Sequence, residues 1–229
     1  AVVMHHIPVT GIVGGDGGDG KLFAPWRNLL EAYQNRGKTP IGDKVFDFSG
    51  VQGRLLCSLT GHEHAERQTY QNGLWHITQP CDAAYSDYIV GSVPWCKDLP
   101  KKEKGSVYEQ TFDAIHIDRR NHALHFTRIG GGGNRTVHLD ALRAKVGEPL
   151  RPQATKREDG ISWGCYDADR VVGKQNPENR YQRFYSYFND VGDISPDGTF
   201  TAKKPGESVI LATAANGDKE IFPVTVSKA

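Results

Sequence analysis

The stretch Leu55-Leu56-Cys57-Ser58-Leu59-Thr60-Gly61-His62-Glu63-His64-Ala65 runs from an apolar segment into a glycine and two histidines one residue apart. The apolar residues 55–59 predict a short buried strand. In a regular strand the two imidazoles would point to opposite faces. Because Gly61 lets the backbone bend without a Cβ clash, a loop after the strand can turn both histidines toward one site, where they can bind two neighbouring metal ions. Taken alone, the H-x-H pattern is more often a pair of surface or core histidines.

A second strand that ends in histidine opens the chain. The apolar residues Ala1-Val2-Val3-Met4 run directly into His5-His6-Ile7-Pro8. A core-facing helix follows: Pro25 suits its first turn, and an apolar stripe at i, i+3, i+4 and i+7 closes before Gly37. Further strands are expected at 45–48, 74–77 and 112–117.

The last ninety or so residues have a different character, because all nine histidines lie between His5 and His138. Turn sequences at 195–198 and 204–207 and an aromatic segment at 181–188 predict short strands. Strands at 208–214 and 221–226 flank Asn216-Gly217, a pair suited to a tight hairpin, and short strands at such spacing indicate a β-sandwich. We therefore predict two domains, residues 1–145 and residues 146–229, with the boundary in the Gly- and Pro-containing segment 145–149.

Composition narrows the classes of partner. Lys and Arg total 28 against 27 Asp and Glu, a net charge of +1, so the broad basic field of an obligate nucleic-acid binder is not expected. The sequence predicts no membrane span, signal peptide or anchor. The four cysteines show no C-x-x-C spacing, so free thiols are expected and a bridge between Cys81 and Cys96 stays an alternative.

Two motifs in order give a specific resemblance. The calcineurin-like metallophosphoesterases carry, in order, D-x-H, G-D, G-N-H-D/E, a strand ending in H-x-P, and G-H-x-H. Residues His6-Ile7-Pro8 match the fourth motif and Gly61-His62-Glu63-His64 match the fifth. The segments 47–53, 111–118 and 127–130 also resemble bacterial members. The resemblance covers roughly residues 1 to 140. It implies an α/β fold, here the C-terminal part of a metallophosphoesterase β-sandwich flanked by helices.

The resemblance also implies a metal site. His6 and His62 would bind one metal and His64 the other, with His5 as a neighbour and not a ligand. Two divalent or trivalent ions about 3.5–4 Å apart would hold a small-molecule phosphoester and generate a hydroxide nucleophile. Imidazole ligands suit Fe, Mn or Zn.

Other ligands of the family belong to its three earlier motifs, and no D-x-H occurs in this chain. The catalytic residues are therefore unknown, and we expect an incomplete site with little activity from this chain alone. The glycine-rich segment 14–21 is not a P-loop, since Leu22 follows Lys21 where Ser or Thr is required. We interpret Asn121-His122 as a polar turn between two strands.

The tail resembles bacterial Ig-like (group 2) modules, in segments 198–206 and 222–226. This resemblance implies an all-β Ig-like sandwich at residues 146–229, and a secreted or cell-surface bacterial protein. Two hypotheses follow. The first is a metal-dependent phosphoester hydrolase; the alternative is a non-catalytic surface-binding or scaffold protein that uses the Ig-like domain to contact a glycan or the cell surface.

Overall fold

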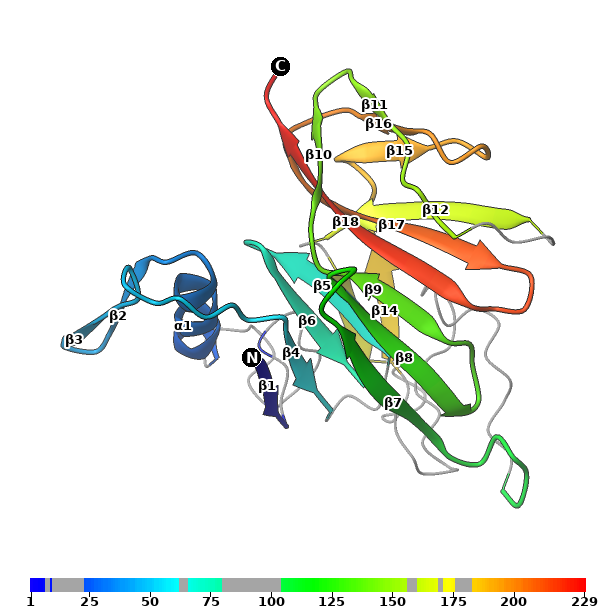
Figure 1. Cartoon of the computed structure of the whole chain (residues 1–229), viewed down its shortest axis with the longest axis horizontal. Helices are drawn as coiled ribbons and strands as arrows, with labels where there is room; N and C mark the ends of the chain where they lie inside the picture. Colours follow the sequence, from blue (N-terminus) through cyan, green and yellow to red (C-terminus); the bar gives the residue numbers. More distant parts are fainter. Residues whose placement is uncertain are drawn as a thin grey trace.

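The computed structural model describes residues 1–6, 9, 23–61, 66–79, 104–155, 160–168, 171–175 and 183–229. Strands make up 51% of the protein, and α1 (Ala24–Gln34) is the only helix within these segments. The predicted β-rich character is confirmed. The several flanking helices that we expected are represented in the described part by α1 alone, which lies beside the strands together with one small hairpin (Figure 1).

The helix α1 begins and ends where the sequence predicted. Pro25 lies in its first turn, where the missing N–H costs no intrahelical hydrogen bond. After the last turn, the amide of Gly37 donates to the carbonyl of Ala32 at 2.8 Å. The apolar stripe buries Leu30, which packs with Leu55 and Leu74 in a small core of its own. This core holds the helix against one end of the first sheet.

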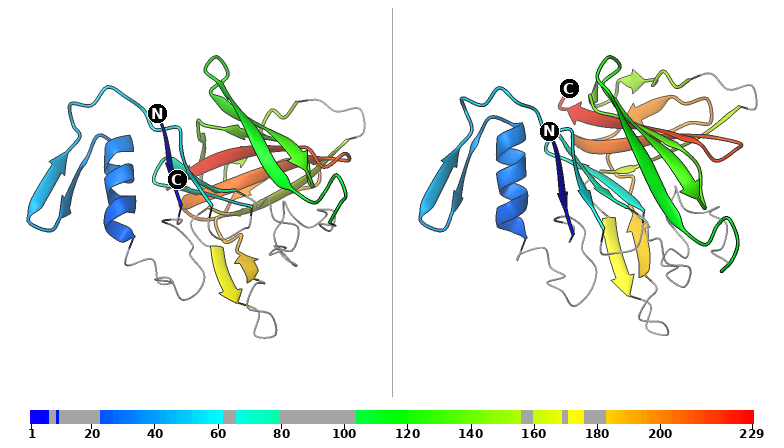
Figure 2. Two further views of the ribbon diagram at one scale, coloured as in Figure 1. Left: turned by 90° about the horizontal axis from the view of Figure 1, so that it is seen from below. Right: turned by 60° about the horizontal axis from the view of Figure 1, so that its bottom comes forward.

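Two short strands after α1 form a hairpin that projects away from the sheets (Figure 2). They are β2 (Lys38–Ile41) and β3 (Lys44–Asp47), which pair antiparallel. β3 matches the strand expected at 45–48, but all four of its residues are exposed. An ion pair between Lys38 Nζ and Asp47 Oδ2, 2.7 Å apart, joins the ends of the hairpin.

The first sheet has four strands in the order β1-β4-β6-β5. They are β1 (Val2–His5), β4 (Cys57–Thr60), β6 (Leu74–Thr78) and β5 (Arg67–Gln71). β1, β4 and β6 run parallel, whereas β5 is antiparallel to β6. The tight turn between β5 and β6 is Asn72-Gly73, with φ values of 49° and 80°, the positive values that a two-residue hairpin loop requires. The strands expected from residues 1–4, 55–59 and 74–77 are all present.

The second sheet has seven strands, with the main order β12-β17-β18-β9-β8-β7 and β10 paired to β18. Their bounds are β7 (Thr111–Asp118), β8 (Ala123–Gly130), β9 (Arg135–His138), β10 (Leu142–Lys145), β12 (Ile161–Asp167), β17 (Gly206–Ala214) and β18 (Lys219–Ser227). The predicted hairpin at Asn216-Gly217 joins β17 to β18, which pair antiparallel. Asn121-His122 forms the predicted turn between β7 and β8.

This second sheet crosses the predicted domain boundary at residue 146. β18 pairs in parallel with β9, with Lys219 opposite Arg135, and also in parallel with β10. Strands from both predicted domains are therefore hydrogen-bonded in one sheet, and the segment 145–149 does not separate two independent sheets.

One hydrophobic core joins the two sheets. Cys57, Leu59, Tyr70, Trp75 and Ile77 from the first sheet belong to the same cluster of buried residues as Leu124, Phe126, Val137, Tyr166, Val209, Leu211 and Ile221 from the second. At roughly 25 cal/mol per Å² of buried apolar area, such a shared core is the main force that holds the sheets together. In addition, Tyr166 Oη donates to the carbonyl of Gln68 at 2.9 Å.

Two smaller sheets complete the described fold. β11 (Pro149–Leu150), β16 (Phe200–Ala202) and β15 (Gly192–Ile194) form one, and β13 (Val171–Gln175) pairs with β14 (Arg183–Tyr187) in the other. A second core, which includes Phe200, Ile210 and Phe222, packs the three-stranded sheet against the other face of β17 and β18. The expected turn at 195–198 is confirmed by a 2.9 Å hydrogen bond from the amide of Gly198 to the carbonyl of Ser195.

Candidate functional site

The two motif-bearing strands lie next to each other and point the same way. β1 and β4 pair in parallel, with His5 opposite Thr60. Just beyond them, the amide of Gly61 donates to the carbonyl of His6 at 3.1 Å. The carboxyl ends of β1, β4 and β6 therefore meet at one edge, which is the edge where open sheets with parallel strands bind ligands.

Of the three predicted ligands, the structure describes one. His6 lies in a bend directly after β1 and is exposed. His62 and His64 lie outside the described residues, as does Glu63 between them. His62 nevertheless follows directly on Gly61, whose backbone is hydrogen-bonded to His6. Within the described residues, no group of three or more His, Cys, Asp or Glu side chains is placed to hold a metal ion.

His5 has a different environment from His6. Its Nε2 lies 2.6 Å from Ser58 Oγ on the neighbouring strand, and its ring meets the indole of Trp26 edge to face, with 6.1 Å between the ring centroids. His5 is the last residue of β1, and its contact with Trp26 places its imidazole on the face of the sheet that α1 covers, whereas His6 lies in the bend that follows. The role of His5 as a neighbour of the site stays a prediction.

The face of the first sheet that carries His5 is polar although it is buried. Ser58, His76 and Thr69 lie directly opposite one another on β4, β6 and β5, and each is less than a tenth exposed. Two residues further along β4 and β6, on the same face, Thr60 Oγ1 lies 3.1 Å from Thr78 Oγ1. The opposite face of the same strands is apolar and forms the shared core. Because these strands are short and buried on both faces, polar and apolar residues do not alternate clearly along their sequences. This polar face was therefore not predicted from the sequence.

His76 is the least expected member of this face. His76 is only 5% exposed, and neither ring nitrogen has a hydrogen-bond partner among the described residues. Burial lowers the pKa of His76 to about 3, helped by the positive charges of Arg67, His5 and Arg27. The imidazole of His76 is therefore neutral at pH 7. It lies near several basic groups on the buried polar face of the first sheet.

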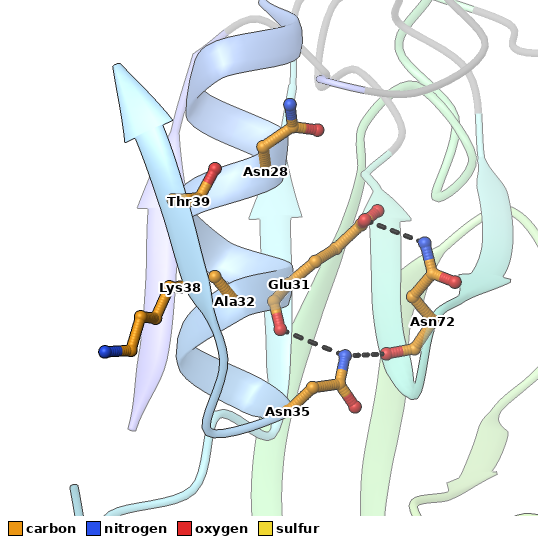
Figure 3. A pocket seen from close by; sticks show the side chains of 7 residues that line it. All are labelled: Asn28, Glu31, Ala32, Asn35, Lys38, Thr39 and Asn72. Atoms are coloured by element: carbon orange, nitrogen blue, oxygen red, sulfur yellow. Dashed lines mark hydrogen bonds between the residues drawn. The ribbon is translucent and has the colours of Figure 1, made fainter. Parts of the chain in front are cut away.

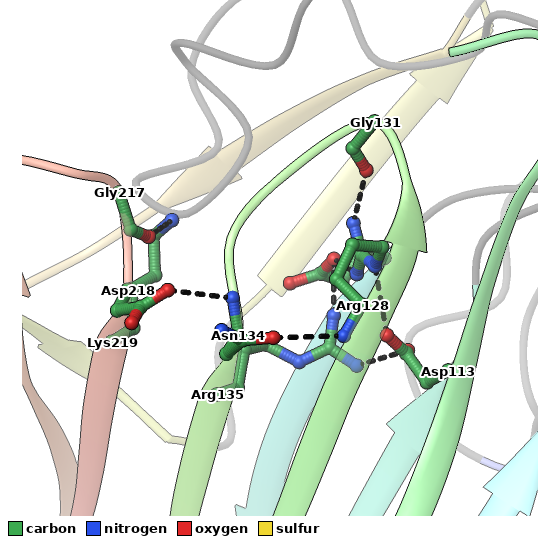
Figure 4. Close-up of polar contacts among 9 residues, drawn as sticks. Asp113, Arg128, Gly131, Asn134, Arg135, Gly217, Asp218 and Lys219 are labelled. Atoms are coloured by element: carbon green, nitrogen blue, oxygen red, sulfur yellow. Dashed lines mark hydrogen bonds and ion pairs between the residues drawn. The ribbon is translucent and has the colours of Figure 1, made fainter. Parts of the chain in front are cut away.

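A network of four buried charges connects the first sheet to the second (Figure 4). Glu66, directly before β5, forms ion pairs with Arg128 and Arg135. Asp113 completes the network, with its oxygens 2.7 Å from Arg128 Nε and 2.6 Å from Arg135 Nη2. All four side chains are nearly inaccessible to solvent. Burial alone would raise the pKa of Glu66, but the two guanidinium groups lower it below its ordinary value. Because each of the four buried charges contacts two groups of opposite charge, we assign this network a structural role.

A polar hollow of about 420 Å³ lies between α1, β2 and the β5–β6 turn (Figure 3). Asn72 Nδ2 donates to Glu31 Oε2 at 2.7 Å, and Asn35 Nδ2 donates to the carbonyl of Asn72 at 2.7 Å. The amide of Asn72 also donates to Glu207 Oε2 on β17 at 2.9 Å. Burial raises the pKa of Glu31, partly opposed by Asn72 and Arg27. These bonds fix α1 beside the strands that carry the motif residues.

Two of the four cysteines, Cys57 and Cys165, lie within the described residues. Cys57 and Cys165 are free thiols, and burial raises the pKa of each to about 12, so neither is an activated nucleophile at neutral pH. Cys81 and Cys96, for which a bridge was an alternative, lie outside the described residues.

Comparison of the chain with protein-family models, with curated proteins and with solved structures found no match. No helix among the described residues is long and apolar enough to cross a membrane.

Proposed function

We propose that this chain is part of a metal-dependent phosphoester hydrolase of the dinuclear-metal class, to which it contributes the imidazoles of His6, His62 and His64. The observation that carries the proposal is the hydrogen bond from the Gly61 amide to the His6 carbonyl. It joins His6, the first residue of H-x-P, to Gly61, the first residue of G-H-x-H, more than fifty residues away in sequence, at one edge of one sheet. A shared metal site requires this proximity.

The donors fit the proposed metals. Neutral imidazole suits Fe, Mn or Zn, and His6 is exposed at the end of β1. His5 is held by Ser58 and stays a neighbour that supports the position of His6. Bound ions of this kind would supply charge stabilisation of the phosphoester and a hydroxide nucleophile at neutral pH.

The site is incomplete under this proposal. The chain has no D-x-H motif to supply a bridging aspartate, so the carboxylate and amide ligands of the family have no matching residues here. We therefore propose low activity for the chain alone on a small-molecule phosphoester.

Hydrolysis of 4-nitrophenyl phosphate with added manganese or zinc tests this function. We expect slow turnover that requires metal, disappears in His64→Ala and persists in His116→Ala, a control that removes a histidine from β7. Turnover that is equal without metal, or unchanged in His64→Ala, would contradict the hydrolase proposal. A kcat of about 10 s⁻¹ is ordinary for a complete enzyme. Such a value would support the hydrolase assignment but contradict the claim that the chain lacks ligands of the metal site.

For the C-terminal part, we propose the Ig-like assignment of residues 146–229 and, with it, a secreted or cell-surface protein. The support is local: β17 and β18 form a long antiparallel hairpin around Asn216-Gly217, and the small sheet of β11, β16 and β15 packs on the opposite side of their core. The parallel pairing of β18 with β9 adds a firm connection to the rest of the chain.

A further inference from the structure

The segment 151–155 lies along two adjoining hollows, of about 820 and 420 Å³, that share Arg151 and Gln153 in their walls. We call the two hollows together the 151–155 groove. Trp163 on β12 and Asp197 in the 195–198 turn line the larger one. Phe222 on β18, with His138 on β9, lines the smaller one. The groove is remote in sequence from the H-x-P and G-H-x-H motifs.

The walls of the groove are held in place by the fold. The amide of Thr155 donates to Glu220 Oε1 at 2.8 Å, which fixes the segment against β18, and Pro152 is buried. Trp163 packs so closely on Gly198 that a Cβ at that position would lie 2.5 Å from the indole. A site whose walls are formed in advance loses little entropy when a ligand binds.

Each hollow has an aromatic surface. In the smaller one the partly exposed His138 ring presents the aromatic face, and it stacks on the buried Phe222, with centroids 4.3 Å apart and planes 10° from parallel. In the larger one the indole of Trp163 is partly exposed. Flat aromatic faces carry partial negative charge, and they attract the polarised C–H groups on the flat side of a sugar ring.

The polar groups of the groove are mixed in charge. Arg151 lines the larger hollow together with Asp197 and the smaller one together with Asp140. Asp140 is already paired, with Arg54 Nη1 at 2.9 Å and His122 Nδ1 at 2.6 Å. The lining therefore lacks the single-sign field that recognises nucleic acid or another charged polymer. The exposed amide of Gln153 offers both donors and an acceptor, which suits vicinal hydroxyl groups.

We propose that the 151–155 groove binds an uncharged oligosaccharide, with sugar rings on the two aromatic surfaces and hydroxyl groups bonded to Arg151 and Gln153. A chain of several sugars fits better than a single one, because the two hollows adjoin at these shared polar residues. This proposal is independent of phosphoester hydrolysis, and it gives the C-terminal part of the chain a binding role.

Calorimetric titration with a panel of neutral hexasaccharides tests the proposal; the probes are the β-1,4-glucose, α-1,4-glucose, mannose, xylose and N-acetylglucosamine hexamers. We expect at least one to bind with a Kd below about 1 mM. Because the ligand is uncharged, its Kd should change less than about twofold between low and high salt. If none of the five binds below 1 mM, or if only heparin or a peptide mixture binds, the proposal is wrong.

Variants locate the site. Trp163→Ala should weaken binding about tenfold, the loss expected for one aromatic contact. Trp26→Ala is the matched control, because it removes an indole that is 39% exposed on α1, and it should change the Kd less than about twofold. Gln153→Ala, at an exposed position, should also weaken binding. If circular dichroism shows that Trp163→Ala does not fold, the Kd of Gln153→Ala tests whether the groove is the binding site. Equal affinity in wild type and Gln153→Ala, with Trp163→Ala either unfolded or unaffected, would overturn the proposal.

Discussion

The amide of Gly61 donates a hydrogen bond to the carbonyl of His6 across 3.1 Å. This bond extends the parallel pairing of β1 and β4 by one step beyond both strands. It connects the last residue before the H-x-H segment to the first residue of the H-x-P segment, and it is the geometric basis of the proposed metal site.

Hydrogen exchange at Gly61 tests this relationship. We expect its amide to exchange with solvent much more slowly than an exposed loop amide, because the bond must open before exchange occurs. The amide of Gly50, in the exposed segment between β3 and β4, is an internal comparison measured in the same NMR spectrum. Equal rates at the two glycines would mean that the ends of β1 and β4 are not joined in solution.

The buried charge network should be sensitive to the loss of one member. Glu66→Gln leaves Arg128 and Arg135 without one of their two carboxylate partners, and an uncompensated buried charge costs about 3–5 kcal/mol of unfolding free energy. Urea denaturation measures this loss. Asp47→Asn, which removes an exposed ion pair with Lys38, is the control and should change stability far less.

A double variant shows whether the four charges act together. Glu66→Gln combined with Arg135→Gln should cost less than the sum of the two single changes, because residues in one network are not additive. Additive losses would contradict the network.

His76 should make the protein less stable in acid. Its pKa of about 3 in the folded state lies below the ordinary value of 6.5, so between these values the unfolded chain binds a proton that the folded protein does not. The unfolding free energy therefore falls as the pH decreases from about 6.5 toward 3, by up to about 1.4 kcal/mol per pH unit from this residue.

His76→Leu isolates that contribution. Leucine removes two ring nitrogens that lack hydrogen-bond partners in the described part of the protein, so at pH 7 we expect stability to rise by about 1 kcal/mol or more. From pH 6.5 downward the variant should lose stability less steeply than wild type. Parallel curves for the two proteins in urea denaturation would show that His76 titrates normally.

Alanine substitutions at two glycines with the same backbone conformation distinguish the cost of backbone strain from the cost of a steric contact. Gly198 and Gly147 have φ values of 86° and 84°, so alanine should cost each about 1–2 kcal/mol through its left-handed backbone. Only at Gly198 does the new Cβ meet a neighbour, the indole of Trp163. Gly198→Ala should therefore lose about 1–3 kcal/mol more than Gly147→Ala in thermal or urea unfolding. Equal losses would show that Trp163 does not lie against the turn.

Local patterns predicted the local structure well. The apolar stripe around Leu30 predicted α1 and its bounds. The turns predicted at Asn216-Gly217 and at 195–198 are present in the structure. Each of these depends on residues within about ten positions of one another. Periodicity and turn chemistry act over this range.

Long-range pairing was not predictable in the same way. Nothing in the segments around Lys219 and Arg135 indicates that they lie side by side, so the boundary near residue 146 was placed where composition changes, although hydrogen bonds cross it. His76 illustrates the same limit. Its burial results from packing between β4, β5 and α1. The local sequence LWHIT predicts a strand but does not indicate that the strand is covered on both faces.

The central claim, that His6, His62 and His64 bind metal together, is tested most directly by equilibrium dialysis against zinc at pH 7. The triple variant His6→Ala/His62→Ala/His64→Ala is compared with His116→Ala/His122→Ala/His125→Ala, which removes the same number of histidines from β7, β8 and the turn between them. We predict that wild type and the second triple variant bind zinc and that the first loses at least about tenfold in affinity, since each imidazole contributes directly to coordination. Equal zinc binding by both triple variants, or none by wild type, would contradict the account.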